Sequence, residues 1–279
     1  MKNESYKIEK FRLYNLSHVI IPFHIKQLKS LTENIKKWSV YRPCFEDDYF
    51  NRKMPKLIFY VGYTNDETIK NLYYKLGDLL PYFRCFSNRY SIDIVKFKFS
   101  KKRDKHIVGA RLMFEHVLAK KHYLFKHASY VFYMEPDCRP IRSGWIDALQ
   151  KEIGFNGFWI KGAMFRGKFE MKINKYLPNK YHINGNAIYN IGDRKFEDFY
   201  FKKLRPYIQR HNDSITAYDT DFFEYLFDLK NYDTVRMIVQ NFAFTETIQN
   251  LWLTNYSVKE IRKKYPKTFL VHGGQQNGA

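Results

Sequence analysis

Short apolar segments alternate with longer helix-like segments in the first half of the sequence, and this order constrains the fold more than any other feature. Hydrophobic periodicity predicts strands and intervening helices at residues 17–25, 27–38, 56–65, 67–80, 91–100, 109–121 and 129–138. This strand–helix order predicts an α/β fold with a mainly parallel central sheet, right-handed crossovers and flanking helices. Ligands of such sheets bind beyond the carboxyl ends of the strands, so those ends are the first places to look for functional residues.

The second half of the sequence is less regular. Short strands and helices are predicted at residues 157–166, 182–191, 196–210, 220–229 and 257–264. The chain has 279 residues, of which 45% are hydrophobic, so it is long and apolar enough to form one large domain with a packed core.

The formal net charge of +20 requires an anionic partner or a strongly basic surface. Nucleic acid, an anionic membrane and a phosphate-bearing ligand are the three partners that such a charge favours. Lysine and arginine are spread along the whole chain, and no nucleic-acid-binding fingerprint occurs. We expect most of the charge to form a solvated basic surface that could also touch a membrane peripherally, and the remainder to attract a diphosphate.

The three cysteines, Cys44, Cys85 and Cys138, form no CxxC pattern. Their odd number argues against a disulfide scaffold and a structural zinc site, and fits a reducing compartment. The longest apolar runs are strand-sized and fall short of the roughly 20 residues that a membrane-spanning helix needs. We therefore expect a soluble, cytoplasmic protein without a transmembrane segment.

The tripeptide Glu135-Pro136-Asp137 follows a run of apolar and aromatic residues, so two carboxylates emerge where a buried strand ends. Pro136 ends the strand and stiffens the turn. Hard divalent ions bind through one or two carboxylates together with substrate phosphates. The alternative is a surface turn in which Glu135 caps the backbone and Asp137 pairs with Arg139 or Arg142; the preceding buried strand favours the functional interpretation.

The stretch VFYMEPDCRPIRSGWIDAL, residues 131–149, resembles the strand–DxD–helix segment of glycosyltransferases with the GT-A fold. The resemblance implies a single GT-A catalytic domain over residues 1–279, with a nucleotide-binding half (1–150) and an acceptor half (151–279). It also implies that Asp137 ligates Mn²⁺ or Mg²⁺. Glu135 would contact the ribose or a metal-bound water, or share the ion, although many members have Asp at this position.

The sequence Val271-His272-Gly273-Gly274 resembles the C-terminal element of the same family, in which a histidine completes the metal shell. The resemblance implies that His272 is the third ligand, and an imidazole beside carboxylates suits Mn²⁺ better than Mg²⁺. The two glycines would allow the backbone to close over a diphosphate. The alternative is a solvent-exposed histidine without a ligand.

The segment from His182 to Tyr189 resembles the part of the family that lies beneath the donor sugar. The resemblance implies that Asn184, Gly185 and Asn186 bind the sugar of the donor. The expected donor is a UDP-sugar. Gly185 can adopt a positive φ, and asparagine both donates and accepts hydrogen bonds. The alternative is an Asn-Gly hairpin turn.

Asp219 and Asp221 stand at the start of a predicted helix, where acidic residues are stabilising in any case. Inverting members of the family commonly place the catalytic base on such a carboxylate. The resemblance therefore implies Asp219, or in second place Asp221, as the base that deprotonates the acceptor. In a retaining enzyme neither carboxylate would need this role.

Pro22, Phe23 and His24 follow the first strand, and Arg111 lies near the start of a helix that follows a basic run. The resemblance implies that the first three contact the nucleotide. Arg111 would lie near the uridine and diphosphate, because a helix N-terminus is a ready anion site. The alternative for Arg111 is a solvated charge.

The sequence thus predicts a hexosyl- or pentosyltransferase, inverting and Mn²⁺-dependent, that acts on a nucleotide sugar and a glycan or glycoconjugate and not on nucleic acid. One alternative is a sugar-nucleotide nucleotidyltransferase, which should carry a glycine-rich basic loop where this chain has Ile21-Pro22-Phe23-His24. The other is a non-catalytic nucleic-acid-binding protein, which the charge alone suggests.

Overall fold

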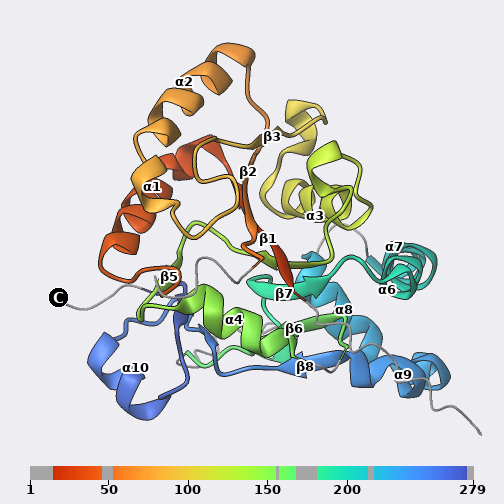
Figure 1. Cartoon of the computed structure of the whole chain (residues 1–279). Coiled ribbons are helices and arrows are strands. Elements are labelled where there is room, and N and C mark those ends of the chain that lie inside the picture. Colours follow the sequence, from red (N-terminus) through yellow and green to blue (C-terminus); the bar gives the residue numbers. More distant parts are fainter. Residues whose placement is uncertain (1–14, 46–52, 155–156, 168–180, 213–216, 275–279) are drawn as a thin grey trace, which may run out of the picture.

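A computed structural model describes residues 15–45, 53–154, 157–167, 181–212 and 217–274 of the chain (Figure 1). The ten strands of the described residues are β1 (Leu16–Phe23), β2 (Lys56–Val61), β3 (Ile94–Lys96), β4 (Tyr130–Tyr133), β5 (Cys138–Pro140), β6 (Ile160–Gly162), β7 (Ala187–Asn190), β8 (Phe242–Phe244), β9 (Ile248–Asn250) and β10 (Leu270–His272).

The helices differ widely in length. The α-helices of the described residues are α1 (Leu28–Lys36), α2 (Asp66–Gly77), α3 (His106–Leu118), α4 (Trp145–Ile153), α6 (Arg194–Phe199), α7 (Arg205–Asn212), α8 (Tyr218–Phe227), α9 (Tyr232–Ile238) and α10 (Val258–Lys264). A π-helical turn, η7 (Tyr200–Leu204), joins α6 to α7. Short 3₁₀ segments include η1 (Ile25–Gln27), η2 (Lys37–Ser39) and η4 (Leu80–Tyr82).

The central sheet has seven strands in the order β3-β2-β1-β4-β7-β6-β8. Strands β3, β2, β1 and β4 are parallel to one another. Strand β7 is antiparallel to both β4 and β6, and β8 is parallel to β6. The predicted α/β fold with a mainly parallel sheet and flanking helices is therefore confirmed. Strand β4 lies in the middle of the sheet, so its carboxyl end opens at the centre of the ligand-binding edge.

Alternate residues of the buried strands point to opposite faces of the sheet, and each face is covered by its own helices. Along β1, Val19 and Ile21 join a core under α1, α2 and α4, while Ile20 joins a second core under α3, α6, α7 and α8. Figure 1 shows α1 and α2 on one side of β1–β3 and α3 on the other. Both faces of the sheet are therefore buried, as expected for parallel strands.

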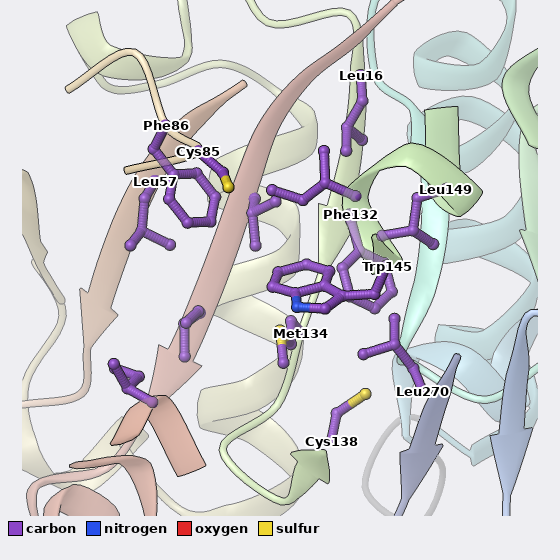
Figure 2. Close-up of a cluster of buried hydrophobic side chains, with 14 of the residues drawn as sticks. Leu16, Leu57, Cys85, Phe86, Phe132, Met134, Cys138, Trp145, Leu149 and Leu270 are labelled. Carbon is purple, nitrogen blue, oxygen red and sulfur yellow. The ribbon is translucent and has the colours of Figure 1, made fainter. Parts of the chain in front are cut away.

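Trp145 anchors the first core where α4 crosses the sheet (Figure 2). The ring is fully buried, and its centroid lies 5.4 Å from that of Trp38 and 6.4 Å from that of Phe86. Figure 2 places Cys138 and Leu270, from the second sheet, beside the same cluster. The core therefore fixes the position of the strands that follow the Glu135–Asp137 turn.

A second sheet of three strands, in the order β5-β10-β9, lies at the end of β4. Strand β10 is antiparallel to β5 and parallel to β9, and His272 is in register with Cys138 on one side and Asn250 on the other. This pairing brings the end of the described chain next to the turn that follows β4.

Cys44 and Cys85 form a disulfide bond, so the prediction against disulfides is wrong for this pair. The two cysteines lie after η2 and after η4, in segments that both cover the first core, and spacing along the sequence carried no signal of this proximity. Cys138 is a free, buried thiol. No helix within the described ranges is long and apolar enough to cross a membrane.

Candidate metal and sugar-nucleotide site

Strand β4 is buried along its whole length and ends at Tyr133, which delivers the next carboxylates to the sheet edge. The Glu135 and Asp137 side chains are 34% and 41% exposed, and the backbone N–H of Cys138 donates to the Glu135 carbonyl at 2.9 Å, which closes the turn. Asn34 of α1 holds the turn from behind, because its Nδ2 donates to the carbonyls of Pro136 (3.2 Å) and Cys138 (2.7 Å). The turn is therefore fixed by the fold before any ligand arrives.

His272, at the end of β10, faces both carboxylates. Its Nε2 lies 3.1 Å from Oε2 of Glu135 and 3.5 Å from Oδ2 of Asp137. One ligand atom from each of the three residues lies within 4.8 Å of the other two. The structure thus brings together the three residues that the sequence analysis named as metal ligands.

The two carboxylates favour a positive charge beside them. Burial raises the pKa of Asp137; the positive charge of His272 opposes this shift, and the charge of Glu135 adds to it. Burial alone would lower the pKa of His272, but the hydrogen bond to Glu135 and the charges of Asp137 and Glu135 outweigh burial and raise that pKa. Two crowded carboxylates therefore hold a proton on the histidine that a metal ion could replace.

The donor set fits a divalent cation. Two carboxylate oxygens and one imidazole nitrogen converge from a rigid turn and a paired strand. Because the carboxylates are partly exposed, further positions around an ion would be open to phosphate oxygens or water.

Asn186, just before β7, braces Glu135. Its Oδ1 accepts the Glu135 backbone N–H, and its Nδ2 donates to Oε2 of the Glu135 carboxylate, both at 2.7 Å. The Asn184 Oδ1 in turn accepts from both Nδ2 (2.9 Å) and the backbone N–H (3.0 Å) of Asn186. Asn186 is fully buried, so it can influence a bound ligand only through Glu135. Asn184 is only partly buried.

Asp219, at the start of α8, lies beside the same segment. Its Oδ2 accepts the Gly185 backbone N–H at 2.9 Å and lies 3.3 Å from His182 Nε2. Burial would raise the pKa of Asp219, but the charge and hydrogen bond of His182 and the backbone N–H of Gly185 hold the pKa below its usual value. Asp219 is therefore an ionised, oriented carboxylate, linked to Glu135 through two adjacent residues: Gly185 bonds Asp219, and Asn186 bonds Glu135.

Gly185 is required for a reason other than the predicted positive φ, which it does not have. A Cβ atom at this position would lie 2.3 Å from the Tyr218 hydroxyl. The glycine therefore permits a close approach of α8. Gly273 and Gly274 do have positive φ values, of 67° and 69°, and pack against the backbone after β9.

Asp221 and Arg111 lie outside this group, in a buried ionic cluster. Asp221 is fully buried and its Oδ2 accepts from Arg205 Nη1 at 3.0 Å. Arg205 Nε lies 3.1 Å from Glu115, whose carboxylate also lies 3.8 Å from Arg111 Nε. The predictions of Asp221 as a base and Arg111 as a diphosphate contact find no support here, because both charges are held by partners inside the protein.

The residues at the end of β1 that were predicted to contact the nucleotide differ in burial. Phe23 is buried in the first core, whereas Pro22 and His24 are only partly buried. His24 Nε2 lies 3.8 Å from Asp104, a carboxylate that also accepts the Tyr63 backbone N–H at 2.7 Å. The pleat of the strand turns the Phe23 side chain inward, and a contact between Phe23 and a nucleotide stays a prediction.

Sequence reasoning missed the residues that hold the site, namely Asn34, Asn250, His182 and Asp104. Asp104 lies next to two glycines, since a Cβ at Gly62 or at Gly109 would lie 2.8 or 2.7 Å from its carboxylate, but the sequence alone does not show this proximity. The three others act across long sequence separations and leave no local pattern.

No model of a known protein family matches the sequence. No curated protein matches it either. Among solved structures, the chain is similar to the glycosyltransferase GlyE of Streptococcus pneumoniae TIGR4, with 9% sequence identity over 92% of this chain and 54% of that chain and a TM-score of 0.49. It is also similar to mouse xyloside xylosyltransferase 1, with 14% identity over 92% of this chain and 97% of that chain and a TM-score of 0.44.

A further similar structure is the mannosyltransferase PcManGT from Pyrobaculum calidifontis in complex with GDP-Man and Mn²⁺, with 9% identity, 74% of this chain and 50% of that chain covered, and a TM-score of 0.40. The chain spans about half the length of GlyE and of PcManGT. At these identities and TM-scores the likenesses carry no weight for activity, so function has to be inferred from the residues of this chain.

Proposed function

We propose that this chain is a glycosyltransferase of the GT-A type, which moves a hexosyl or pentosyl group from a nucleotide-diphosphate sugar to a hydroxyl of a glycan or glycoconjugate. The proposed donor is a UDP-sugar, the proposed ion is Mn²⁺ or, in second place, Mg²⁺, and the proposed stereochemical outcome is inversion. No role in nucleic-acid binding is proposed.

One observation carries this proposal. Glu135 and Asp137 at the carboxyl end of the central strand β4 converge with His272, and Asn186 and Gly185 connect this group to the partly buried carboxylate of Asp219. A diphosphate needs a cation, and an attacking hydroxyl needs a proton acceptor. Both kinds of group are present side by side at the sheet edge where α/β proteins bind ligands.

The ion, when bound, would stabilise the negative charge that develops on the departing nucleoside diphosphate. Asp137, Glu135 and His272 would hold it, with Asn186 keeping the Glu135 carboxylate in place. Because the fold lowers the pKa of Asp219, this carboxylate is ionised at neutral pH and able to accept the proton of the acceptor hydroxyl.

The proposed donor site extends over two neighbouring segments. Asn184 and the Gly185 backbone are proposed to contact the sugar, while Pro22, His24 and Asp104 are proposed to line the nucleotide side. The Tyr63 N–H that binds Asp104 fixes that carboxylate next to the ends of β1 and β2. The net charge of +20 would favour the approach of an anionic donor.

Location and membrane contact remain predictions. Peripheral contact with a membrane through the basic surface is compatible with the charge. A cytoplasmic location was predicted from the cysteines, but the Cys44–Cys85 bond is of a kind that persists mainly in oxidising compartments, and it counts against that prediction.

The test is a panel of UDP-, GDP- and TDP-sugars incubated with the protein in Mn²⁺, in Mg²⁺ and with a chelator. We expect turnover or slow hydrolysis of one donor class, dependent on the ion. Binding of none of the nucleotide sugars would refute the proposal. Binding of single-stranded oligonucleotides with a steep salt dependence, and no response to Mn²⁺, would instead favour a nucleic-acid-binding protein.

The stereochemical outcome is tested separately by NMR of the product's anomeric proton. Inversion supports Asp219 as the base. Retention would remove that role from Asp219 and leave the metal site unaffected, because the two assignments depend on different residues.

A further inference from the structure

Asn250, the last residue of β9, lies directly beside His272. The two residues are in register in the parallel pair β9–β10, and the side-chain oxygen Oδ1 of Asn250 lies 3.1 Å from Nδ1 of the His272 ring. Asn250 is 2% exposed, so this contact is shielded from water. The Asn250 backbone is also fixed on its other side, where its carbonyl accepts the Arg166 N–H at 2.8 Å.

The backbone N–H of Trp252 determines which end of the Asn250 amide faces the ring. This N–H donates to Asn250 Oδ1 at 3.2 Å. A backbone N–H can only donate, so the atom that receives it must be the amide oxygen and not the amide nitrogen. The same oxygen therefore faces Nδ1 of His272, and Nδ1 has to carry the proton of that hydrogen bond.

The Trp252 N–H cannot easily move away. The Leu251 N–H donates to the His272 carbonyl at 3.0 Å, and Gly273 packs so closely that a Cβ there would lie 2.8 Å from Trp252 Cα. Gly273 has a φ of 67°, which other residues rarely adopt. The loop after β9 and the turn after β10 thus hold Trp252, Asn250 and His272 in one arrangement.

We propose that Asn250 is a positioning residue that fixes His272 with its proton on Nδ1 and leaves Nε2 to face the metal site. This inference rests on the proposed function, because it names the residue that orients the third metal ligand. Nε2 is the atom that lies next to Glu135 and Asp137. A ring held through Nδ1 cannot turn to offer the other nitrogen, and outer-shell partners of this kind typically increase metal affinity about 10- to 100-fold.

The first test needs no metal. NMR of the metal-free protein with ¹⁵N-labelled histidine should show a proton on His272 Nδ1 that exchanges slowly with solvent. The proton should persist in Asn250→Asp, which keeps an oxygen acceptor, and exchange rapidly in Asn250→Leu, which has similar size and no acceptor. A rapidly exchanging or absent Nδ1 proton in the unaltered protein would overturn the inference.

The second test is a titration with Mn²⁺ followed by electron paramagnetic resonance. We expect Asn250→Leu to weaken Mn²⁺ binding about 10- to 100-fold and Asn250→Asp to bind at least as tightly as the unaltered protein. The control is Asn88→Leu, which removes an asparagine that bonds the Leu57 backbone and Asp93 away from the metal site, and should leave Mn²⁺ binding unchanged.

Equal Mn²⁺ affinity in a folded Asn250→Leu and the unaltered protein would overturn the inference, and so would an Asn250→Asp that binds as weakly as Asn250→Leu. If Asn250→Leu does not fold, the proton on Nδ1 of the unaltered protein and the behaviour of Asn250→Asp still decide the matter. Failure of the unaltered protein to bind Mn²⁺ would refute the proposed function instead. The two failures can be told apart, because the NMR measurement tests the role of Asn250 without the ion.

Discussion

Asn186 binds Glu135 twice: its Oδ1 accepts the Glu135 backbone N–H and its Nδ2 donates to the Glu135 carboxylate, both at 2.7 Å. One buried side chain therefore fixes both the direction of the turn after β4 and the rotamer of the carboxylate. Asn34 donates hydrogen bonds to the carbonyls of the same turn. Asn250 contacts the ring of His272 through its side-chain oxygen. Each arm of the candidate metal site is thus held by an asparagine from a different part of the chain.

Asp137→Asn should abolish metal-dependent turnover while leaving the fold intact. The substitution keeps the size of the side chain but removes its charge, so Mn²⁺ affinity should fall by about 100-fold or more, as expected for a loss of several kcal/mol. The measurement is Mn²⁺ titration with donor hydrolysis. Asp66→Asn, at an exposed carboxylate on α2, is the control and should change neither. Unchanged activity of Asp137→Asn would remove the metal assignment.

Asp219→Asn should lower kcat and leave donor binding nearly unchanged. The amide oxygen can still accept the Gly185 N–H, but it cannot take a proton, so kcat should fall by about 10²- to 10⁴-fold if Asp219 is the base. Steady-state kinetics with both substrates measure this. The exposed carboxylate of Asp233 provides the control variant Asp233→Asn. A kcat within the error of the unaltered enzyme would contradict the role.

Gly185→Ala should destabilise the site, because the added methyl group would collide with the Tyr218 hydroxyl, 2.3 Å away. Overpacking of this kind typically costs about 1–3 kcal/mol of unfolding free energy. The measurement is urea unfolding. Tyr218→Phe removes the hydroxyl, so the double variant should regain part of the loss; equal destabilisation with and without the hydroxyl would show that the close approach has another cause.

Acid should destabilise the protein through His18. Burial, with a contribution from the positive charge of Lys56, lowers the pKa of His18 from 6.5 to about 4. Between pH 6.5 and pH 4, His18 is therefore protonated in the unfolded chain but mostly neutral in the folded chain. The contribution of His18 to stability is complete above about pH 6.5 and is lost as the pH falls toward 4. The loss approaches about 3 kcal/mol for this residue.

Urea unfolding across this pH range checks the prediction. His18→Gln, which does not titrate, should show a shallower loss of stability than the unaltered protein, whereas His127→Gln, at an exposed position, should not. Parallel pH profiles of His18→Gln and the unaltered protein would contradict the proposed origin of the acid sensitivity.

Removal of the Cys44–Cys85 bond should lower the free energy of unfolding. The bond joins residues 41 positions apart, and closing a loop of that length contributes on the order of 2–4 kcal/mol. The double variant Cys44→Ala/Cys85→Ala and the unaltered protein in reductant should lose a similar amount in urea unfolding. A stability that reductant does not change would indicate that the bond does not form in solution.

The parallel half of the fold was predictable because its signals are local. Strands β1, β2 and β4 each contain an apolar run, and Asn65 caps α2 where the sequence places a helix start. Strand β3 is shorter than its alternating pattern predicted, since only Ile94–Lys96 pair with β2. The stretch predicted as one helix at 196–210 contains a π-helical turn, which no periodicity indicates.

The candidate metal ligands could be named for a similar reason, since a carboxylate pair at a strand end and a histidine before two glycines are visible in the sequence, and the structure brings the three residues together. The supporting residues were not. Asn34 and Asn250 look like ordinary polar positions, and only the pairing of distant segments brings them to Pro136 and His272. Two carboxylates at one helix start look alike in sequence, and only the structure shows that the helix turns Asp221 toward Arg205.

Strand β10 enters the structure after every strand of the seven-stranded sheet has been synthesised, yet it supplies His272. During synthesis all seven strands of the main sheet therefore leave the ribosome before His272 does. The three residues of the candidate metal site can come together only after β10 has paired with β5 and β9, so the formation of this group depends on completion of the second sheet.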